Sequence, residues 1–172
     1  VLTRSGELEE VRLDKITERI QRLSSKIPKL DIDPVEISQQ VCSRLKDEIT
    51  TEELDELSGE ICISLATKHP DFGLLASRIV VDNHQKNTHK NFSTVMKILY
   101  ENLDINDNRA PLISEKLWKI ILLNSKKVES IINYERDFDF DYFGFKTLQK
   151  SYLFKSNGEI IERPQHMWLR VS

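Results

Sequence analysis

The chain of 172 residues has only two cysteines and five glycines. Cys42 and Cys62 form no C-x-x-C pair, and each directly follows an apolar residue, Val41 or Ile61, that we expect on a buried helix face. This arrangement disfavours a zinc site and favours two buried free thiols over a disulfide.

The sequence also lacks an excess of basic residues, with 25 Lys and Arg against 28 Asp and Glu. A basic nucleic-acid footprint is therefore missing, although a small anionic ligand needs only a local cluster of charge. No apolar run approaches the roughly 20 residues of a membrane span, and no signal-peptide pattern opens the sequence. We expect a soluble cytoplasmic protein with no nucleic-acid or membrane partner.

Aromatic residues are nearly absent from the first half, where Phe72 is the only one before Lys90, whereas several crowd together between residues 134 and 145. This shift predicts a domain boundary near Lys90, with one domain over residues 1–90 and a second over 91–172. His84 and His89 are five residues apart, a poor spacing for shared metal ligation, and we expect both to be surface side chains.

The stretch of residues 1–20 combines a turn, alternating residues and the start of a helix. Ser5-Gly6 is typical of a tight turn, and the alternation of Glu9, Val11 and Leu13 predicts a β-hairpin with these three residues on one face. Asp14 is a suitable N-cap for a following helix that begins with Lys15 and Ile16.

An anion held between Lys15, Arg4 and free backbone N–H groups would stabilise a lysine placed at a helix N-terminus. Glu9 would lie near the turn and could accept a hydrogen bond from an adenine amino group. On spacing alone, an ordinary solvated lysine after a cap remains the simpler interpretation of Lys15.

Further along, capping patterns predict a series of helices. Asp33-Pro34 opens a helix that we expect to end near Lys46 to Glu48, and Thr50 with Glu53 forms a capping box for the next one. In that helix Leu54, Leu57, Ile61 and Leu65 are expected on the buried face. Thr51 and Asp55 share one edge outside this apolar stripe.

Similar patterns continue to the end of the sequence. Asp71 is a candidate cap for a helix that points Leu74, Leu75, Ile79 and Val80 inward. Further predicted features are a helix with Phe92, Val95, Met96 and Leu99 buried, a polar loop over 102–111, helices over 115–124 and 126–132, a hairpin at Asn157-Gly158 and a helix from Pro164. The predicted fold is mainly α, a small helical bundle capped by an N-terminal β-hairpin and followed by further helices and a short second hairpin.

The opening stretch resembles the ATP-cone, the regulatory nucleotide-binding module at the N-terminus of ribonucleotide reductase large subunits. The pattern V-x-K-R-x-G-x-x-E-x-[VI]-x-[FL]-D-K-I is matched at Arg4, Gly6, Glu9, Val11, Leu13, Asp14, Lys15 and Ile16. The sequence departs from it at Thr3, where the family usually has lysine.

Four later segments resemble successive landmarks of the class I ribonucleoside-diphosphate reductase large subunit, in the same order. They are TTEELDELSGE, ATKHPDFGLLASRI, YERDFDFDYFGFKTLQKSYLF and ERPQHMWLRVS. Trp168, where the family commonly has leucine, is a departure that affects packing. Together with the cone motif, these segments cover nearly the whole chain.

The resemblance implies an allosteric site for ATP or dATP, with Mg²⁺. The implied contact residues are Thr3, Arg4, Glu9, Glu10, Val11, Arg12, Leu13, Asp14, Lys15, Ile16, Thr51, Asp55 and Lys86. Arg4, Lys15, Lys86 and N–H groups near Thr51 would hold phosphates, Glu9 would accept from adenine, Val11 and Ile16 would pack on the base, and Asp55 would accept from a ribose hydroxyl. Without the resemblance, Asp55 would be a favourable acid in a first helical turn, and Lys86 an ordinary surface lysine.

The family reduces ribonucleotides by radical chemistry with cysteines in a ten-stranded barrel, and neither Cys42 nor Cys62 falls in a matching motif. We therefore expect the regulatory N-terminal part of the enzyme, inactive by itself, with no catalytic residues. Its implied partners are the rest of the large subunit, a radical-generating small subunit and further copies of the large subunit. The alternatives are a cone-bearing transcriptional regulator, which would need a zinc ribbon or a basic surface, and a helical interaction module that binds no nucleotide.

Overall fold

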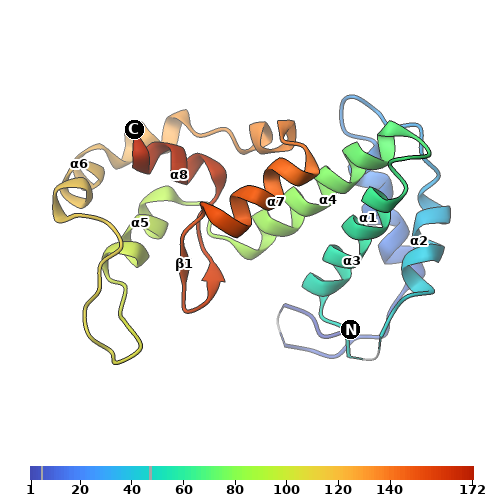
Figure 1. Cartoon of the computed structure of the whole chain (residues 1–172), viewed down its shortest axis with the longest axis horizontal. Coiled ribbons are helices and arrows are strands. Elements are labelled where there is room, and N and C mark those ends of the chain that lie inside the picture. The colour runs from blue at the N-terminus through green and yellow to red at the C-terminus, as the bar shows by residue number, and fades with distance from the viewer. Residues whose placement is uncertain (5, 47) are drawn as a thin grey trace. The chain divides into compact units, whose positions relative to one another are not determined.

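The computed structural model describes residues 1–4, 6–46 and 48–172, and it is built mainly from helices. Ser5 of the predicted turn and Asp47 at the predicted end of the second helix lie outside these residues. The elements in chain order are α1 (Leu13–Ser24), α2 (Pro34–Cys42), α3 (Thr51–Ser64), α4 (Pro70–Asn87), α5 (Phe92–Tyr100), α6 (Glu115–Ile131), the 3₁₀ helix η1 (Tyr134–Asp139), α7 (Tyr142–Ser151), β1 (Lys155–Ser156), β2 (Glu159–Ile160) and α8 (Pro164–Val171) (Figure 1). The predicted mainly α class is confirmed.

The chain forms two compact units. The first comprises residues 1–83 and 140–146, and the second comprises 84–139 and 147–172. The division falls between Asn83 and His84 within α4, and between Lys146 and Thr147 within α7.

In the first unit, α1 packs against α2, and α2 packs against α3. These helices contribute apolar side chains with at most 2% of their surface exposed, among them Ile20, Leu23, Ile37, Val41 and Ile61. In α4, Leu75, Ile79 and Val80 are buried as predicted, but Leu74 is 46% exposed.

Two predicted helix starts are confirmed by their capping contacts. The side chain of Asp33 accepts a hydrogen bond from the N–H of Val35, with Pro34 as the first residue of α2. At α3, the Thr50 hydroxyl accepts from the Glu53 N–H at 3.1 Å, and the Glu53 carboxylate accepts from the Thr50 N–H at 2.8 Å. Local side-chain chemistry alone specifies these two ends.

Three other helix ends differ from the predictions. α1 begins at Leu13 with Arg12 in the N-cap position, so Asp14 is its second residue. α2 ends at Cys42, about four residues early. The N–H groups of Arg44 and Leu45 donate to carbonyls three residues back in the sequence, as in a 3₁₀ turn, instead of four residues back. α4 begins at Pro70, and the Asp71 carboxylate accepts from the N–H of Asp31 instead of capping the helix.

The N-terminal hairpin is smaller than predicted. Among the residues of this hairpin that the structure describes, one antiparallel bridge joins Leu2 to Leu8, and the N–H of Thr3 donates to the carbonyl of Glu7 at 2.8 Å. Leu2 also bridges Thr50, since its N–H donates to Ile49 and its carbonyl accepts from Thr51. The hairpin is thereby attached to the start of α3.

Buried Arg78 of α4 fixes the end of α1. Its guanidinium donates to the carbonyls of Leu23 at 2.9 Å, Lys26 at 3.2 Å and Pro28 at 2.7 Å. These carbonyls lie at and beyond the helix C-terminus, where α1 can no longer supply N–H partners. Desolvation lowers the pKa of this arginine from its usual value.

The second unit has its own apolar core, in which α5 packs on α6. Its buried residues are Phe92, Val95, Met96, Leu99, Ile113 and Ile121, so the predicted inward face of α5 is confirmed. The predicted helices over 115–124 and 126–132 form one continuous helix, α6. The hairpin of β1 and β2 turns at Asn157 and Gly158, whose positive φ angles of 52° and 85° suit a primed turn.

The prediction of a surface position for His84 is wrong. His84 is 4% exposed, with its Nε2 2.9 Å from the Glu162 carbonyl and its Nδ1 3.1 Å from the amide nitrogen of Gln149. A carbonyl oxygen only accepts hydrogen bonds, so the Nε2 of His84 donates to Glu162.

His166 at the start of α8 is fully buried in a similar network. Its Nδ1 accepts from the N–H of Arg163, and its Nε2 lies 2.7 Å from the hydroxyl of Tyr134, which donates onward to the Lys90 carbonyl. The ring is therefore neutral with its proton on Nε2. Desolvation, with a smaller contribution from Arg163, lowers the pKa of His166 to about 3.

None of the helices in the described part of the chain is both long enough and apolar enough to cross a bilayer. Of the two cysteines, Cys62 is fully buried and desolvation raises its pKa to about 12, whereas Cys42 is partly exposed. Both are free thiols, as predicted, but of the two only Cys62 is buried.

Candidate functional site

The start of α3 carries two of the predicted site residues, Thr51 and Asp55. They lie one helical turn apart, and Asp55 is only 3% exposed although we expected it outside the buried stripe. The N–H of Thr51 donates to the Leu2 carbonyl and that of Glu53 to the Thr50 hydroxyl. These two N–H groups are thus engaged within the protein, contrary to the expectation that N–H groups near Thr51 are free for phosphate.

Arg4 reaches from the hairpin to this edge of α3. Its Nη1 lies 3.3 Å from the Thr51 hydroxyl, and its Nη2 lies 3.1 Å from Oδ2 of Asp55 and 2.6 Å from Oδ1 of Asn83. The attachment of Leu2 to residues 49–51 brings the arginine into this position. Three residues of the predicted site, Arg4, Thr51 and Asp55, are therefore in direct contact.

The predicted residues before α1 and in its first turn form exposed ion pairs. The Lys15 ammonium lies 2.6 Å from the Glu9 carboxylate, which lowers the pKa of Glu9, and Arg12 pairs with Asp14. Glu10 is also exposed, and Thr3 accepts the N–H of Glu7 with its hydroxyl.

The apolar members of the predicted site differ in exposure. Val11 is 39% and Leu13 43% exposed, so neither faces the core. Ile16 is 8% exposed and belongs to the buried face of α1. Surface for stacking a base is thus present at Val11 and scarce at Ile16.

Lys86 is exposed in the last turn of α4 and belongs to the second unit. The other predicted site residues all belong to the first unit.

Four residues that the sequence analysis missed complete a charged cluster beside Asp55. Arg19 of α1 pairs with Asp55 and, through Nη2, with Asp82 of α4 at 3.0 Å. Arg22 lies 3.0 Å and 3.1 Å from the two oxygens of Asp82, and Asn83 accepts from Arg4. We call Arg4, Arg19, Arg22, Asp55 and Asp82 the arginine–aspartate cluster.

A sequence pattern for part of this cluster exists. Lys15, Arg19 and Arg22 recur at i, i+4 and i+7, which places three cations on one face of α1. Asp82-Asn83 is a polar pair directly after the apolar run of residues 79–81. Neither pattern by itself indicates which carboxylate the arginines contact.

The arginine–aspartate cluster suits an anionic ligand better than a cationic one. Its three guanidinium groups face two carboxylates, which leaves one positive charge in excess among these five side chains. Arg19 is 20% exposed, and desolvation lowers its pKa to about 10, so it stays charged at neutral pH. Guanidinium groups bind phosphate oxygens through paired hydrogen bonds.

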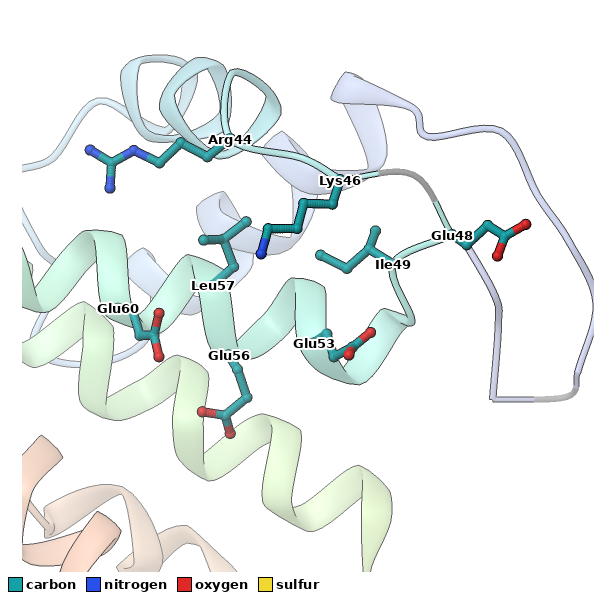
Figure 2. A pocket seen from close by; sticks show the side chains of 8 residues that line it. All are labelled: Arg44, Lys46, Glu48, Ile49, Glu53, Glu56, Leu57 and Glu60. Atoms are coloured by element: carbon teal, nitrogen blue, oxygen red, sulfur yellow. The ribbon is translucent and has the colours of Figure 1, made fainter.

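A hollow of about 360 Å³ lies along another face of α3 (Figure 2). Its lining residues are Arg44, Lys46, Glu48, Ile49, Glu53, Glu56, Leu57 and Glu60. At 100° per residue, Glu53, Leu57 and Glu60 are on the side of α3 opposite Asp55. The size is in the range of ligand pockets, but four carboxylates against two cations disfavour a nucleotide triphosphate there.

Within residues 1–4, 6–46 and 48–172, no three His, Cys, Asp or Glu side chains are grouped as ligands for a metal ion. A magnesium ion that accompanies a nucleotide commonly keeps several waters and binds through the phosphates.

The chain is similar to proteins of known families along its whole length. Residues 1–87 match the model of the ATP cone domain, and residues 138–172 match that of the ribonucleotide reductase all-alpha domain. It is 47% identical over 176 residues to the ribonucleoside-diphosphate reductase large subunit of Dictyostelium discoideum, and 49% identical over 173 residues to that of Caenorhabditis elegans. Each alignment covers 100% of this chain and 20% or 22% of the relative, so the chain spans about a fifth of their length.

Proposed function

The chain belongs to the ATP-cone family, and from this membership we propose that it is the allosteric activity-regulating domain of a ribonucleoside-diphosphate reductase large subunit. ATP is its activating effector and dATP its inhibitory one. The observation that carries the proposal is the contact of Arg4 with both Thr51 and Asp55, because it joins residues from the two separate motifs that the resemblance assigns to one nucleotide site.

The phosphates are held by arginine and lysine side chains. Lys15 contacts an acidic group, Glu9, that a phosphate would replace as its partner. Arg4 can bind a phosphate and keep its contact with Asp55, because a guanidinium has five N–H donors. Exposed ion pairs such as Lys15 with Glu9 contribute little free energy, so a phosphate can displace the carboxylate at small cost. Lys86 enters the proposed site from the resemblance alone.

The base and sugar are recognised by the carboxylates. Once Lys15 turns to phosphate, Glu9 is available to accept from the adenine amino group, and exposed Val11 offers apolar surface for the ring. Asp55 accepts from a ribose hydroxyl. Guanine carries a carbonyl oxygen where adenine carries the amino group, and an acceptor such as Glu9 would repel it.

Calorimetric titration of the 172-residue chain with Mg²⁺ complexes of ATP, dATP and GTP tests this function. We expect ATP and dATP to bind and GTP to bind at least about tenfold more weakly. Glu9→Gln, which adds a donor at the same position, is expected to reduce the preference for adenine. A chain that binds neither ATP nor dATP would instead be a helical interaction module.

We further propose that this domain controls deoxyribonucleotide synthesis by changing how large subunits assemble, and that it acts in the cytoplasm with the rest of the large subunit and a radical-generating small subunit. A ligand shifts such an equilibrium only through different affinities for the two states. The 172 residues alone are expected to be inactive, because Cys42 and Cys62 match no redox motif of the family. Formation of deoxynucleotide from CDP by the purified chain with a small subunit would contradict this. The transcriptional-regulator alternative finds no support in two cysteines and a formal net charge of −3.

A further inference from the structure

Arg19 lies between two aspartates from different helices. One of its terminal nitrogens pairs with Oδ1 of Asp55 in α3, and the other lies 3.0 Å from Oδ2 of Asp82 in α4. Arg19 itself comes from α1, so one planar guanidinium joins three helices of the first unit. Its Nε is buried and has no hydrogen-bond partner in the part of the chain that the structure describes.

Asp82 is fixed in turn by a second arginine. Nη2 of Arg22 contacts both oxygens of Asp82, at 3.0 Å and 3.1 Å, and the Asp82 side chain is 11% exposed. A carboxylate held by two guanidinium groups has little freedom to rotate. Asp82 therefore restrains Arg19, and Arg19 restrains Oδ1 of Asp55.

Asp55 retains acceptor capacity despite these contacts. Arg4 contacts its Oδ2 and Arg19 contacts its Oδ1, whereas the two oxygens of a carboxylate together offer about four acceptor positions. The directions of the remaining positions are determined by the two arginines, because together they fix the plane of the carboxylate.

We propose that Arg19, restrained by Asp82, is a positioning residue that orients Asp55 toward the sugar of the effector, and thereby sets the discrimination between ATP and dATP. The inference rests on the proposed function, since it presumes that a nucleotide binds with its sugar at Asp55. It assigns to Arg19 and Asp82 a role in specificity that neither sequence pattern nor exposure indicated.

A role in orientation is distinguishable from a role in charge. The triphosphates of ATP and dATP are the same, so a change in the cluster's charge alters both affinities by the same factor. The two nucleotides differ in one sugar hydroxyl, so a change in the orientation of Asp55 alters the ratio of the two affinities. The ratio is therefore the quantity that separates the two roles.

The main test is Arg19→Lys, with Arg44→Lys as the control, because Arg44 is an exposed arginine outside the arginine–aspartate cluster. Lysine keeps the positive charge but carries its three N–H donors on one nitrogen, so it cannot span two carboxylates as a planar guanidinium does. In calorimetric titrations, Arg19→Lys should shift the ratio of ATP to dATP affinity by about threefold or more, toward the ratio of Asp55→Asn. Arg44→Lys should leave the ratio near that of the wild type, because Arg44 lies outside the group of side chains that holds Asp55.

Two further variants make the test decisive. Asp82→Asn keeps the Arg19 and Asp55 side chains but removes the negative charge that restrains Arg19, so it should also shift the ratio of ATP to dATP affinity. Both nucleotides should bind more tightly, because one negative charge beside the phosphates is lost. If Arg19 acts through Asp55, then Arg19→Lys should cause no further shift in the Asp55→Asn background.

The outcomes separate this inference from the proposed function. If the wild type binds both nucleotides and Asp55→Asn changes the ratio, but Arg19→Lys and Asp82→Asn keep the wild-type ratio, the inference is overturned and the function stands. The inference is also overturned if Arg19→Lys shifts the ratio of ATP to dATP affinity by the same factor in the Asp55→Asn background as in the wild type. If the folded wild type binds no nucleotide, the function fails and the inference with it.

Discussion

Nη2 of Arg4 lies 3.1 Å from Oδ2 of Asp55, 51 positions later in the sequence. Asp55 is 3% exposed, whereas the Arg4 side chain is 35% exposed. The contact thus connects an accessible cation to a buried carboxylate, and a ligand that binds the first can sense the second. An effector that approaches from solvent would meet Arg4 before Asp55.

The exposed pair of Lys15 with Glu9 leads to a prediction about phosphate binding. Lys15→Ala should weaken ATP binding by about tenfold to a hundredfold, as expected for the loss of a charge-assisted hydrogen bond to phosphate. Lys86→Ala should have a similar effect, because the resemblance assigns Lys86 to the same phosphates. Calorimetry at two salt concentrations checks both, since the wild-type affinity should fall as salt rises.

Lys29→Ala is the matched control for these lysine variants, because Lys29 is an exposed lysine outside the cone motif. It should bind ATP as the wild type does. If Lys15→Ala also binds ATP normally while its circular dichroism is unchanged, the phosphates lie elsewhere and Lys15 is an ordinary surface lysine.

Arg78 allows a prediction about stability. Its guanidinium donates to carbonyls at and beyond the end of α1, so Arg78→Met would remove this donor from the buried carbonyl of Leu23 and from the partly buried carbonyls of Lys26 and Pro28. We expect the free energy of unfolding to fall by about 2 to 4 kcal/mol. Urea unfolding measures this loss. Arg44→Met, at an exposed arginine, should change it by less than about 0.5 kcal/mol.

Buried His166 predicts a pH dependence of stability. Its pKa is lowered to about 3 in the folded protein, against 6.5 for an ordinary histidine. Between these pH values the unfolded chain binds one proton more at His166 than the folded chain does. The contribution of His166 to the free energy of unfolding therefore falls as the pH falls from about 6.5 towards 3. The slope is at most about 1.4 kcal/mol per pH unit.

The comparison of His166→Gln with the wild type isolates this contribution. The free energy of unfolding, measured with urea at pH 7 and pH 5, should fall less in His166→Gln than in the wild type. In His89→Gln, a substitution at an exposed histidine, it should fall as much as in the wild type. Equal slopes in the wild type and His166→Gln would show that His166 is not buried in its neutral form.

Several elements were predictable because neighbouring residues alone determine them. Pro34 after the Asp33 cap, the capping box of Thr50 with Glu53, and the turn at Asn157-Gly158 each depend on contacts within a few residues. The end of α2 at Cys42 was not predictable in this way, because no glycine or proline follows Cys42 to mark a helix C-terminus. The turn there is set by backbone hydrogen bonds after Val41.

The wrong predictions of exposure for Asp55 and His84 have another cause. Asp55 and His84 look like surface residues because polar side chains on helices usually are. Both are buried because distant residues supply their partners: Arg4 and Arg19 for Asp55, and Glu162 with Gln149 for His84. Such long-range pairs leave no periodic pattern in one sequence. The resemblance to the ATP-cone, not the pattern, placed Asp55 in the site.

The final prediction concerns Asp55 itself. A carboxylate can only accept hydrogen bonds, whereas asparagine of nearly the same shape offers one acceptor and one donor group. Because ATP and dATP differ by a single sugar hydroxyl, Asp55→Asn should change the ratio of their affinities by about 1 kcal/mol or more, since Asp55 is buried. It should also uncouple any change in oligomeric state that dATP causes and ATP does not.

Calorimetry with both nucleotides, and light scattering on a chain long enough to assemble, would measure these effects. Thr51→Ser is the matched control, because it keeps the hydroxyl that Arg4 contacts and should leave the ratio unchanged. Asp55→Asn also weakens the ion pairs with Arg4 and Arg19, which frees positive charge for the phosphates and should tighten both nucleotides together. Only the ratio reports on the sugar. If ATP and dATP shift by the same factor, Asp55 acts through charge alone, and the sugar is sensed by another residue.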